Sequence, residues 1–174
     1  MTIREAKISD IEDLMFFYDK MCEYLGQKAF LPNGNKGGFP PRKMVETAIA
    51  EHNQFVGIKD DHIIAAYIMN HEWDAAYDTV TWQIDAKKEA VVTLHALRVL
   101  PEHSGFGYAR QLVEHAIETA KQRGILSIRL DCIEGNDVPQ KMYMSYGFRY
   151  IDTVEITYED IGVPRKFLVY ELVL

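Results

Sequence analysis

Apolar side chains recur at steps of three and four residues in four stretches of the chain, which is the spacing of one face of an α-helix. The first stretch follows Ser9, whose Ser-Asp-Ile-Glu sequence has the pattern of a capping box, and its apolar face continues to Gly26. The other three stretches cover residues 42–51, 109–120 and 136–146. We therefore expect four helices, with Gly124 as the C-terminal cap of the third.

Strands are indicated by stretches that alternate between apolar and polar residues or that are rich in β-branched residues. One short stretch of this kind begins at Ile3. The others are residues 54–59, 62–71, 90–100, 126–132, 148–158 and 166–174. The run 90–100 is long and strongly apolar, as expected of a central strand that is buried on both faces. Because the third helix connects it to 126–132, these two strands should be parallel. The order of elements predicts one domain of the α/β class across residues 1–174.

Two stretches do not have the pattern of a regular element. Residues 29–41 are interrupted throughout by Pro and Gly and should form a long loop, which either covers a site or is a tolerated surface loop. Residues 72–88 mix aromatic side chains with charged ones, and we expect an irregular insertion there that holds a short strand at 79–84.

Composition narrows the functional class. The chain has 174 residues, 48% of them hydrophobic, so a complete core can form without disulfides or a structural metal. Its 19 Lys and Arg residues against 26 Asp and Glu residues give a net charge of −7, which argues against a general nucleic-acid binder. No apolar stretch approaches the ~20 residues of a membrane span. We expect a cytoplasmic location, because the first residues lack an apolar signal core and Cys22 and Cys132 do not form a CxxC pair.

A glycine-rich turn connects the strand 90–100 to the third helix, and its sequence is Ser104-Gly105-Phe106-Gly107. A helix N-terminus reached through such a turn presents unpaired amides and the positive end of the helix dipole, so phosphate is its natural ligand. A P-loop would need Lys and then Ser or Thr where Tyr108 and Ala109 stand. A dinucleotide fingerprint would need a small residue in place of Arg110. The turn therefore fits neither of these two kinds of phosphate site.

Two motifs carry a resemblance to a known family. The first is Leu97-Arg98-Val99-Leu100-Pro101-Glu102-His103-Ser104-Gly105-Phe106-Gly107-Tyr108-Ala109, and the second is Asn136, Tyr143, Gly147 and Phe148. They resemble the two signatures of the GNAT superfamily of acetyl-CoA-dependent N-acetyltransferases. The first signature is a strand that ends in Leu-x-Val, followed by a proline and by Gln/Arg-x-x-Gly-x-Gly/Ala. The second is an Asn, then a Tyr, then Gly-Phe at the spacing found here. Ser104 departs from the family pattern, because it takes the Gln/Arg place.

The resemblance implies a GNAT-like fold, with a mixed, mostly antiparallel central sheet that is flanked by helices and split around the coenzyme. It also implies acetyl-CoA as co-substrate. Backbone groups of Leu97, Arg98 and Val99 would bind the pantetheine arm and the thioester, and Asn136 would lie beside that arm. The phosphate loop would consist of Ser104, Gly105, Phe106, Gly107, Tyr108 and Ala109.

Two side chains are candidates for proton transfer. Tyr143 matches the family tyrosine beside the thioester sulfur, where a phenol can protonate the leaving thiolate; the alternative is an aromatic side chain that packs on the core. His95 matches a histidine base of some members and could titrate near neutral pH; the alternative is a strand histidine held by one backbone bond. Thr93 stands where other members carry a glutamate base, and Cys132 is best interpreted as a small buried hydrophobe.

The expected function is an N-acetyltransferase that moves acetyl from acetyl-CoA to a primary amine of a small molecule or peptide by direct attack in a ternary complex. A non-catalytic acyl-CoA-binding regulatory domain is the alternative. No metal is expected, because Ala75 replaces the second histidine of the motif that His71 begins. We expect an acceptor that carries a further positive charge, attracted by acidic residues flanking the cleft, and a homodimer is compatible with the sequence. Those acidic residues are Glu72, Asp74, Asp78, Glu155, Glu159 and Asp160.

Overall fold

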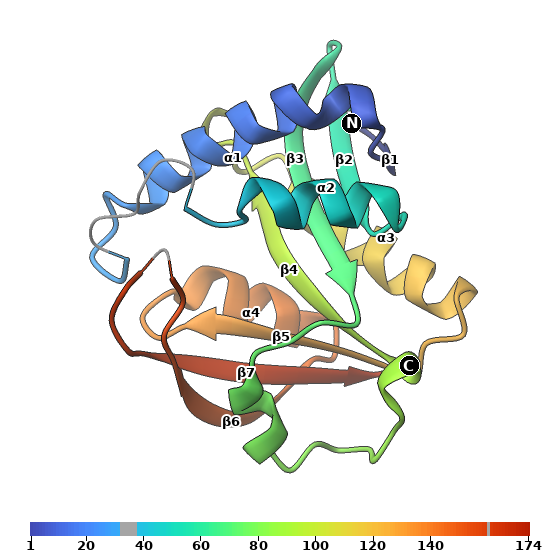
Figure 1. The fold of residues 1–174 in the computed structure, drawn as a ribbon, viewed down its shortest axis with the longest axis vertical. Coiled ribbons are helices and arrows are strands. Elements are labelled where there is room, and N and C mark those ends of the chain that lie inside the picture. Colours follow the sequence, from blue (N-terminus) through green and yellow to red (C-terminus); the bar gives the residue numbers. More distant parts are fainter. Residues whose placement is uncertain (32–37, 160) are drawn as a thin grey trace.

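A seven-stranded sheet with the strand order β1-β2-β3-β4-β5-β7-β6 forms the centre of the computed structural model, which describes residues 1–31, 38–159 and 161–174 (Figure 1). The strands are β1 Thr2–Glu5, β2 Gln54–Lys59, β3 His62–Asn70, β4 Val91–Val99, β5 Ser127–Ile133, β6 Arg149–Ile156 and β7 Arg165–Val173. Strands β4 and β5 are parallel, and the other neighbouring pairs are antiparallel. The expected mixed, mostly antiparallel sheet is therefore confirmed, including the parallel pair.

Four α-helices flank this sheet, as the apolar spacing predicts. They are α1 Ile11–Leu25, α2 Arg42–Ala50, α3 Tyr108–Gln122 and α4 Asp137–Ser145. In Figure 1, α1 and α2 cross in front of β2, β3 and β4, and α3 lies behind them. Within the part of the chain that the structure describes, no helix is long and apolar enough to cross a membrane.

The start of α1 differs from the expected capping box at Ser9. A short 3₁₀ helix, Ile8–Asp10, precedes α1, and the carboxylate of Asp10 accepts the backbone N–H of Lys7 at 2.7 Å. The same carboxylate is paired with Arg4 of β1 at 2.6 Å. The ion pair with Arg4 holds the Asp10 carboxylate in place. Lys7, and not Ser9, is therefore the residue that caps the first helical turn.

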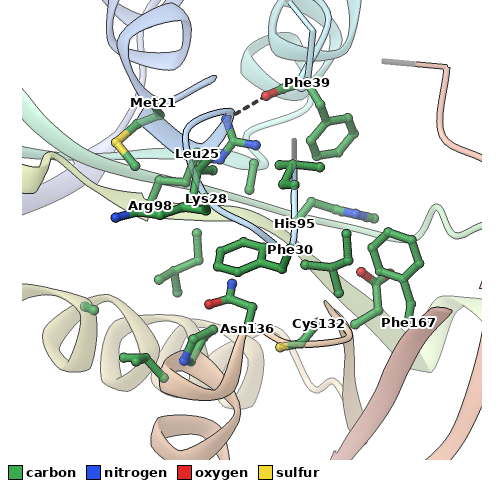
Figure 2. Close-up of a pocket in the computed structure, with 18 of the residues that line it drawn as sticks. Met21, Leu25, Lys28, Phe30, Phe39, His95, Arg98, Cys132, Asn136 and Phe167 are labelled. Carbon is green, nitrogen blue, oxygen red and sulfur yellow. Dashed lines mark hydrogen bonds between the residues drawn. The ribbon is translucent and has the colours of Figure 1, made fainter. Parts of the chain in front are cut away.

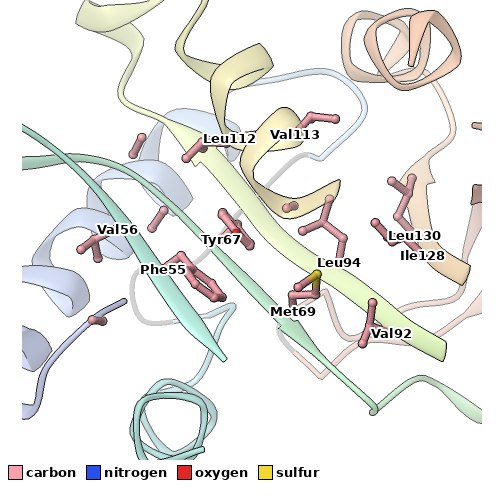
Figure 3. Close-up of a cluster of buried hydrophobic side chains, with 14 of the residues drawn as sticks. Phe55, Val56, Tyr67, Met69, Val92, Leu94, Leu112, Val113, Ile128 and Leu130 are labelled. Carbon is pink, nitrogen blue, oxygen red and sulfur yellow. The ribbon is translucent and has the colours of Figure 1, made fainter. Parts of the chain in front are cut away.

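The main core lies between the helices and the sheet. Leu112 and Val113 of α3 are fully buried and belong to this core, which Figure 3 shows together with apolar side chains of the central strands. On β2 and β3, the rings of Phe55 and Tyr67 stack with centroids 4.8 Å apart. The aromatic pair packs β2 against β3, and α3 packs on β3 and β4, the strand that borders the pocket described below.

The prediction of a strand at 79–84 is wrong. The insertion between β3 and β4 contains a 3₁₀ helix, Ala75–Thr79, then an irregular path without strand pairing, and a second 3₁₀ helix, Lys88–Ala90. Its aromatic side chains explain this, because Tyr77 is buried and Trp82 packs on it and donates its indole N–H to the Tyr77 carbonyl at 3.1 Å. Together with residues of β6 and β7 they form a second core on one face of the sheet. Packing on a face, rather than pairing at an edge, determines the path of the insertion.

Candidate functional site

Strands β4 and β5 separate soon after they begin to pair. Their parallel ladder covers Val91–Thr93 of β4 and 127–129 of β5, and no pairing between these strands follows in the described residues. Farther along β4, Ala96 has a positive φ of +49°, and the register with β3 shifts at this point. A cavity of about 620 Å³ opens between the two strands (Figure 2). The sheet is thus split at the place where the resemblance requires it.

The β4 wall of this cavity provides backbone groups without a strand partner. Leu97, Arg98 and Val99 line the cavity. Arg98 and Val99 pair with β3, Leu97 lies at the register shift between these two strands, and the parallel ladder with β5 includes none of the three. An extended backbone edge of this kind can form ladder-type hydrogen bonds with the amides of an extended ligand. The three residues expected to bind the pantetheine arm therefore lie at a free edge inside the sheet, which fits that ligand.

The glycine-rich turn leads from this wall to the N-terminus of α3. Gly105 and Gly107 have φ values of +82° and +76°, a conformation that favours glycine, and Gly107 is the N-cap residue of α3. A Cβ added at either position would meet no atom within 4 Å, so the space above both backbones is open. Phe106 is 64% exposed and stacks on Tyr108.

The cavity reaches this turn at its far side. Ala109 lines the cavity, whereas Ser104 and the other turn residues are not part of the lining. The free amides of the first helical turn and the open backbone of the glycines suit a pyrophosphate that extends out of the cavity mouth. The residues present thus fit a coenzyme A loop.

Helix α4 brings two of the expected residues to the opposite wall. Asn136 is the N-cap residue of α4, and its amide group points into the cavity in Figure 2. Tyr143 is 6% exposed, packs edge-on against Phe148 and lines the cavity. Among the described residues, none forms a hydrogen bond with its hydroxyl group. Burial raises the pKa of Tyr143 well above the usual value of 10, and nearby Cys132 adds to this, so the phenol keeps its proton.

His95 lines the same cavity from β4. Its Nε2 lies 3.0 Å from Oδ1 of Asn70 and 2.9 Å from the carbonyl oxygen of Glu72. Both partners can only accept, so Nε2 carries the proton and Nδ1 holds the lone pair. Burial lowers the pKa of His95 to about 4. The side chain is therefore neutral at pH 7, and the expected ionisation near neutral pH is replaced by a much lower one.

The described ends of the loop 29–41 cover the cavity. Phe30, Leu31 and Phe39 line it, and the guanidinium of Arg98 donates to the carbonyl oxygen of Phe39 at 2.7 Å. Residues 32–37 of this loop lie outside the described residues. Of the two alternatives for the loop, a cover over a site is the one supported by these contacts.

The acidic residues expected around the cleft are not part of its lining. Of the six, the five described ones are absent from the cavity wall, and Asp160 lies outside the described residues. The acidic residue in the wall is Asp131 of β5, whose Oδ2 accepts the hydroxyl groups of Tyr77 at 2.8 Å and Tyr158 at 2.9 Å. The alternating pattern of 126–132 places Asp131 on the polar face, and at this position β5 pairs with β7 beyond the end of its ladder with β4. A carboxylate at the end of a central strand was the signal that could have identified it.

Two further expectations concern alternative chemistry. Cys132 is buried, and burial together with Asp131 raises the pKa of its thiol, so a thiolate nucleophile is disfavoured and the interpretation as a buried hydrophobe is confirmed. His71 donates from Nδ1 to the carbonyl oxygen of Val91 at 2.7 Å, because a carbonyl oxygen can only accept. The described residues contain no group of three or more His, Cys, Asp or Glu side chains placed to hold a metal ion.

Comparison with known proteins identifies a family for this site. Residues 19–148 match the sequence model of the Acetyltransferase (GNAT) family. A comparison with curated protein sequences gives no match. The matched range contains the split strands, the glycine-rich turn and α4, and the strands and α4 contribute many of the residues that line the cavity.

Solved structures of similar fold cover almost the whole chain. Ribosomal-protein-alanine N-acetyltransferase from Brucella melitensis superposes with a TM-score of 0.74 at 16% identity over 100% of both chains. An N-acetyltransferase from Staphylococcus aureus Mu50 gives 0.74 at 17% identity, over 99% of this chain and 97% of that one. The structure of yncA from Salmonella typhimurium with its cofactor acetyl-CoA gives 0.73 at 16% identity, over 100% and 94%. At these identities the likeness establishes the fold.

Proposed function

This chain belongs to the acetyltransferase (GNAT) family and is an acetyl-CoA-dependent acetyltransferase, and on that premise we propose that it acetylates a primary amine of a small molecule or peptide. The observation that carries the proposal is the continuity of one cavity. It extends from the first turn of α3 at Ala109, along the free edge of β4, to His95 and Tyr143. A cavity of this shape holds a long thioester at one end and leaves its reacting carbonyl group beside two side chains that can handle protons.

Coenzyme binding in this proposal uses the residues predicted from the sequence. The pyrophosphate lies on the amides from Ser104 to Ala109, and the pantetheine amides pair with the free edge at Leu97, Arg98 and Val99. The amide side chain of Asn136 faces the arm from α4. These contacts hold the thioester in a fixed position, so much of the rate acceleration comes from positioning the amine against it.

The acetyl transfer takes place in a single ternary complex. The neutral amine nitrogen attacks the thioester carbonyl carbon, a C–N bond forms and the C–S bond breaks. Nδ1 of His95 accepts the proton that the nitrogen loses, and the hydroxyl of Tyr143 donates its proton to the leaving sulfur. Solvent then returns a proton to Tyr143 and removes one from His95, which closes the proton balance.

Direct attack is favoured over an acyl-enzyme route because the thiol in the cavity wall, Cys132, is poorly suited to act as a nucleophile. The experiment is a screen of amines with release of the coenzyme thiol as the readout, including a peptide N-terminus because one similar structure is a ribosomal-protein-alanine acetyltransferase. With the best acceptor, initial-rate plots should intersect, and Cys132→Ala should retain turnover. Parallel plots together with an inactive Cys132→Ala variant would contradict the ternary complex.

The non-catalytic alternative makes a different prediction in the same screen. A regulatory acyl-CoA-binding domain would bind acetyl-CoA in calorimetry but release no thiol with any amine above the rate of solvent hydrolysis. Turnover that depends on Tyr143 excludes this alternative.

A further inference from the structure

Asp131 is a carboxylic acid whose two oxygens have different surroundings. Oδ2 accepts two phenol hydroxyl groups, from Tyr77 of the insertion and from Tyr158 after β6. Among the described residues, none donates to Oδ1. The side chain lines the cavity, so Oδ1 is the oxygen left for a ligand.

This carboxylate also lacks a counter-charge. None of the ion pairs formed by the described residues includes Asp131. Burial raises its pKa, the two tyrosine hydroxyl groups oppose that rise, and the neighbouring charge of Asp74 raises the pKa further. Placing an anion in a largely apolar site without a cation is costly, so the protein alone leaves this site incomplete.

Aromatic rings surround the same end of the cavity. The ring of Tyr158 packs edge-on against Phe167 at 5.1 Å and lies 5.8 Å from the ring of Phe39. Ile133 and Ile161 line the wall beside them. In Figure 2, Phe39, His95 and Phe167 are drawn on one side of the cavity and Met21 and Arg98 on the other. The carboxylate therefore lies at an apolar end, distinct from the end near α3.

We propose that Asp131 binds the ammonium group of the acceptor through Oδ1, and that the acceptor is a primary amine whose carbon body is apolar, such as an aryl-alkyl amine. This inference rests on the proposed function and names its substrate class. The ammonium supplies the missing counter-charge, and the rings of Phe39, Tyr158 and Phe167 pack against the carbon body. The bound amine loses one proton to solvent before it attacks the thioester.

This substrate class differs from the acceptor expected from charge alone. The described acidic residues of that expectation do not line the cavity, so a second positive charge on the acceptor has no partner there. A carboxylate on the acceptor would be repelled by Asp131. The structure therefore selects against both diamines and amino acids relative to simple monoamines of the same length.

Tyr77 is a positioning residue for this site. It comes from the insertion, and its hydroxyl bond to Oδ2 restrains the orientation of the carboxyl group. Tyr77→Phe should raise KM for the amine with little change in kcat. A purely structural role would alter the thermal midpoint without this split between KM and kcat.

The test compares Asp131→Asn with Asp152→Asn, an exposed Asp-to-Asn change on β6 that alters the net charge equally. In Asp131→Asn the amide oxygen can still accept both tyrosine hydroxyl groups, while an NH₂ group replaces Oδ1. The probes are phenethylamine against phenylalanine, which adds a carboxylate, and hexylamine against 1,6-diaminohexane, which adds an amine. Binding of phenethylamine to the protein saturated with coenzyme A is measured by calorimetry, and turnover by thiol release.

We expect Asp131→Asn to weaken phenethylamine binding and raise its KM at least tenfold, with unchanged acetyl-CoA affinity, while Asp152→Asn matches the parent. Phenethylamine and hexylamine should have the higher kcat/KM of their pairs. Equal amine binding by the parent and Asp131→Asn, or a preference for phenylalanine or the diamine, overturns the inference while acetylation stands. If phenethylamine binds in an Asp131-dependent way but no amine releases thiol, the proposed function fails and the binding site stands.

Discussion

Nε of Arg129 lies 3.0 Å from Oε1 of Glu171, and both side chains are buried within the sheet. The same carboxylate accepts the hydroxyl of Ser127 at 2.8 Å and the backbone N–H of Gln83 at 2.6 Å. It therefore ties the insertion to β5 and β7. The insertion also carries Tyr77, whose hydroxyl group donates to Asp131 in the cavity wall.

Breaking this pair should destabilise the whole protein. Glu171→Gln leaves the buried guanidinium of Arg129 without a counter-charge, and we expect the free energy of unfolding to fall by roughly 3 kcal/mol. Glu155→Gln, at an exposed position of β6, should change it by less than about 0.5 kcal/mol. Urea unfolding measures both. Equal stability of the two variants would show that the pair is not the anchor of the insertion.

Two glycine substitutions can distinguish a loss of coenzyme binding at the phosphate loop from a loss of stability caused by backbone strain. Gly107 and Gly124 both have positive φ, +76° and +70°, and a Cβ at either position would meet no atom within 4 Å. Gly107→Ala and Gly124→Ala should therefore lose similar stability, about 1 kcal/mol. The Gly107 variant alone should bind acetyl-CoA at least tenfold more weakly in calorimetry, since its methyl group occupies the pyrophosphate space. Equal coenzyme affinity in the two variants would refute the loop assignment.

The acid role of Tyr143 predicts a loss confined to the chemical step. Tyr143→Phe keeps the ring and its packing on Phe148, so acetyl-CoA affinity should stay unchanged while kcat falls by ~10²–10⁴-fold. Tyr146→Phe, near the end of the same helix with its hydroxyl bonded to Glu114, should retain the parent kcat. Steady-state kinetics and calorimetry decide between this role and simple packing. If Tyr143→Phe retains the kcat of the parent, solvent and not Tyr143 protonates the leaving thiolate.

The pH dependence of turnover should follow the acceptor and not His95. Because burial lowers the pKa of His95 to about 4, its neutral form prevails throughout the range in which an amine titrates. The rise of kcat/KM with pH should therefore shift when an acceptor of different amine pKa is used. A rise near neutral pH that stays in place with both acceptors, and disappears in His95→Gln, would contradict the low pKa.

The same histidine should make stability depend on pH. Its pKa is 6.5 in the unfolded chain and about 4 when folded, so between these values the unfolded chain binds more protons. Its contribution is complete above about pH 6.5 and is lost as the pH falls toward 4, by about 3 kcal/mol. His95→Gln keeps an N–H donor for Asn70 and does not titrate, so urea unfolding at several pH values should show a smaller loss. A loss as large as in the parent would place the titration elsewhere.

The stability contribution of Asp131 should change with pH in the opposite direction to that of His95, because the pKa of Asp131 is raised in the folded protein. Above that pKa the buried charge costs stability, and the cost disappears as the pH falls through it. Asp131→Asn should therefore be more stable than the parent at pH 7, and the difference should shrink on acidification. A difference that grows at low pH would reverse the assigned direction.

The sequence by itself determined the elements and the family. Apolar spacing along the chain predicts the four helices and seven strands, since burial of one face dictates that spacing locally. The glycines at 105 and 107 are expected from the sequence because a tight turn favours glycine, and both have a positive φ. The roles of Asn136 and Tyr143 follow from the resemblance to the family and stay predictions. The capping box at Ser9 and the strand at 79–84 failed because contacts from other elements, Arg4 and the second core, outweighed local preference.

The tertiary structure decided the chemistry at the acceptor end. The separation of β4 and β5 creates the cavity, and only folding brings together Asp131, Tyr77 and Tyr158, which come from three distant segments. It also lowers the pKa of His95 by burying a ring that the sequence leaves free to titrate near neutral pH. Burial and long-range contacts set protonation states, because the cost of a charge depends on its three-dimensional surroundings and not on its neighbours along the chain.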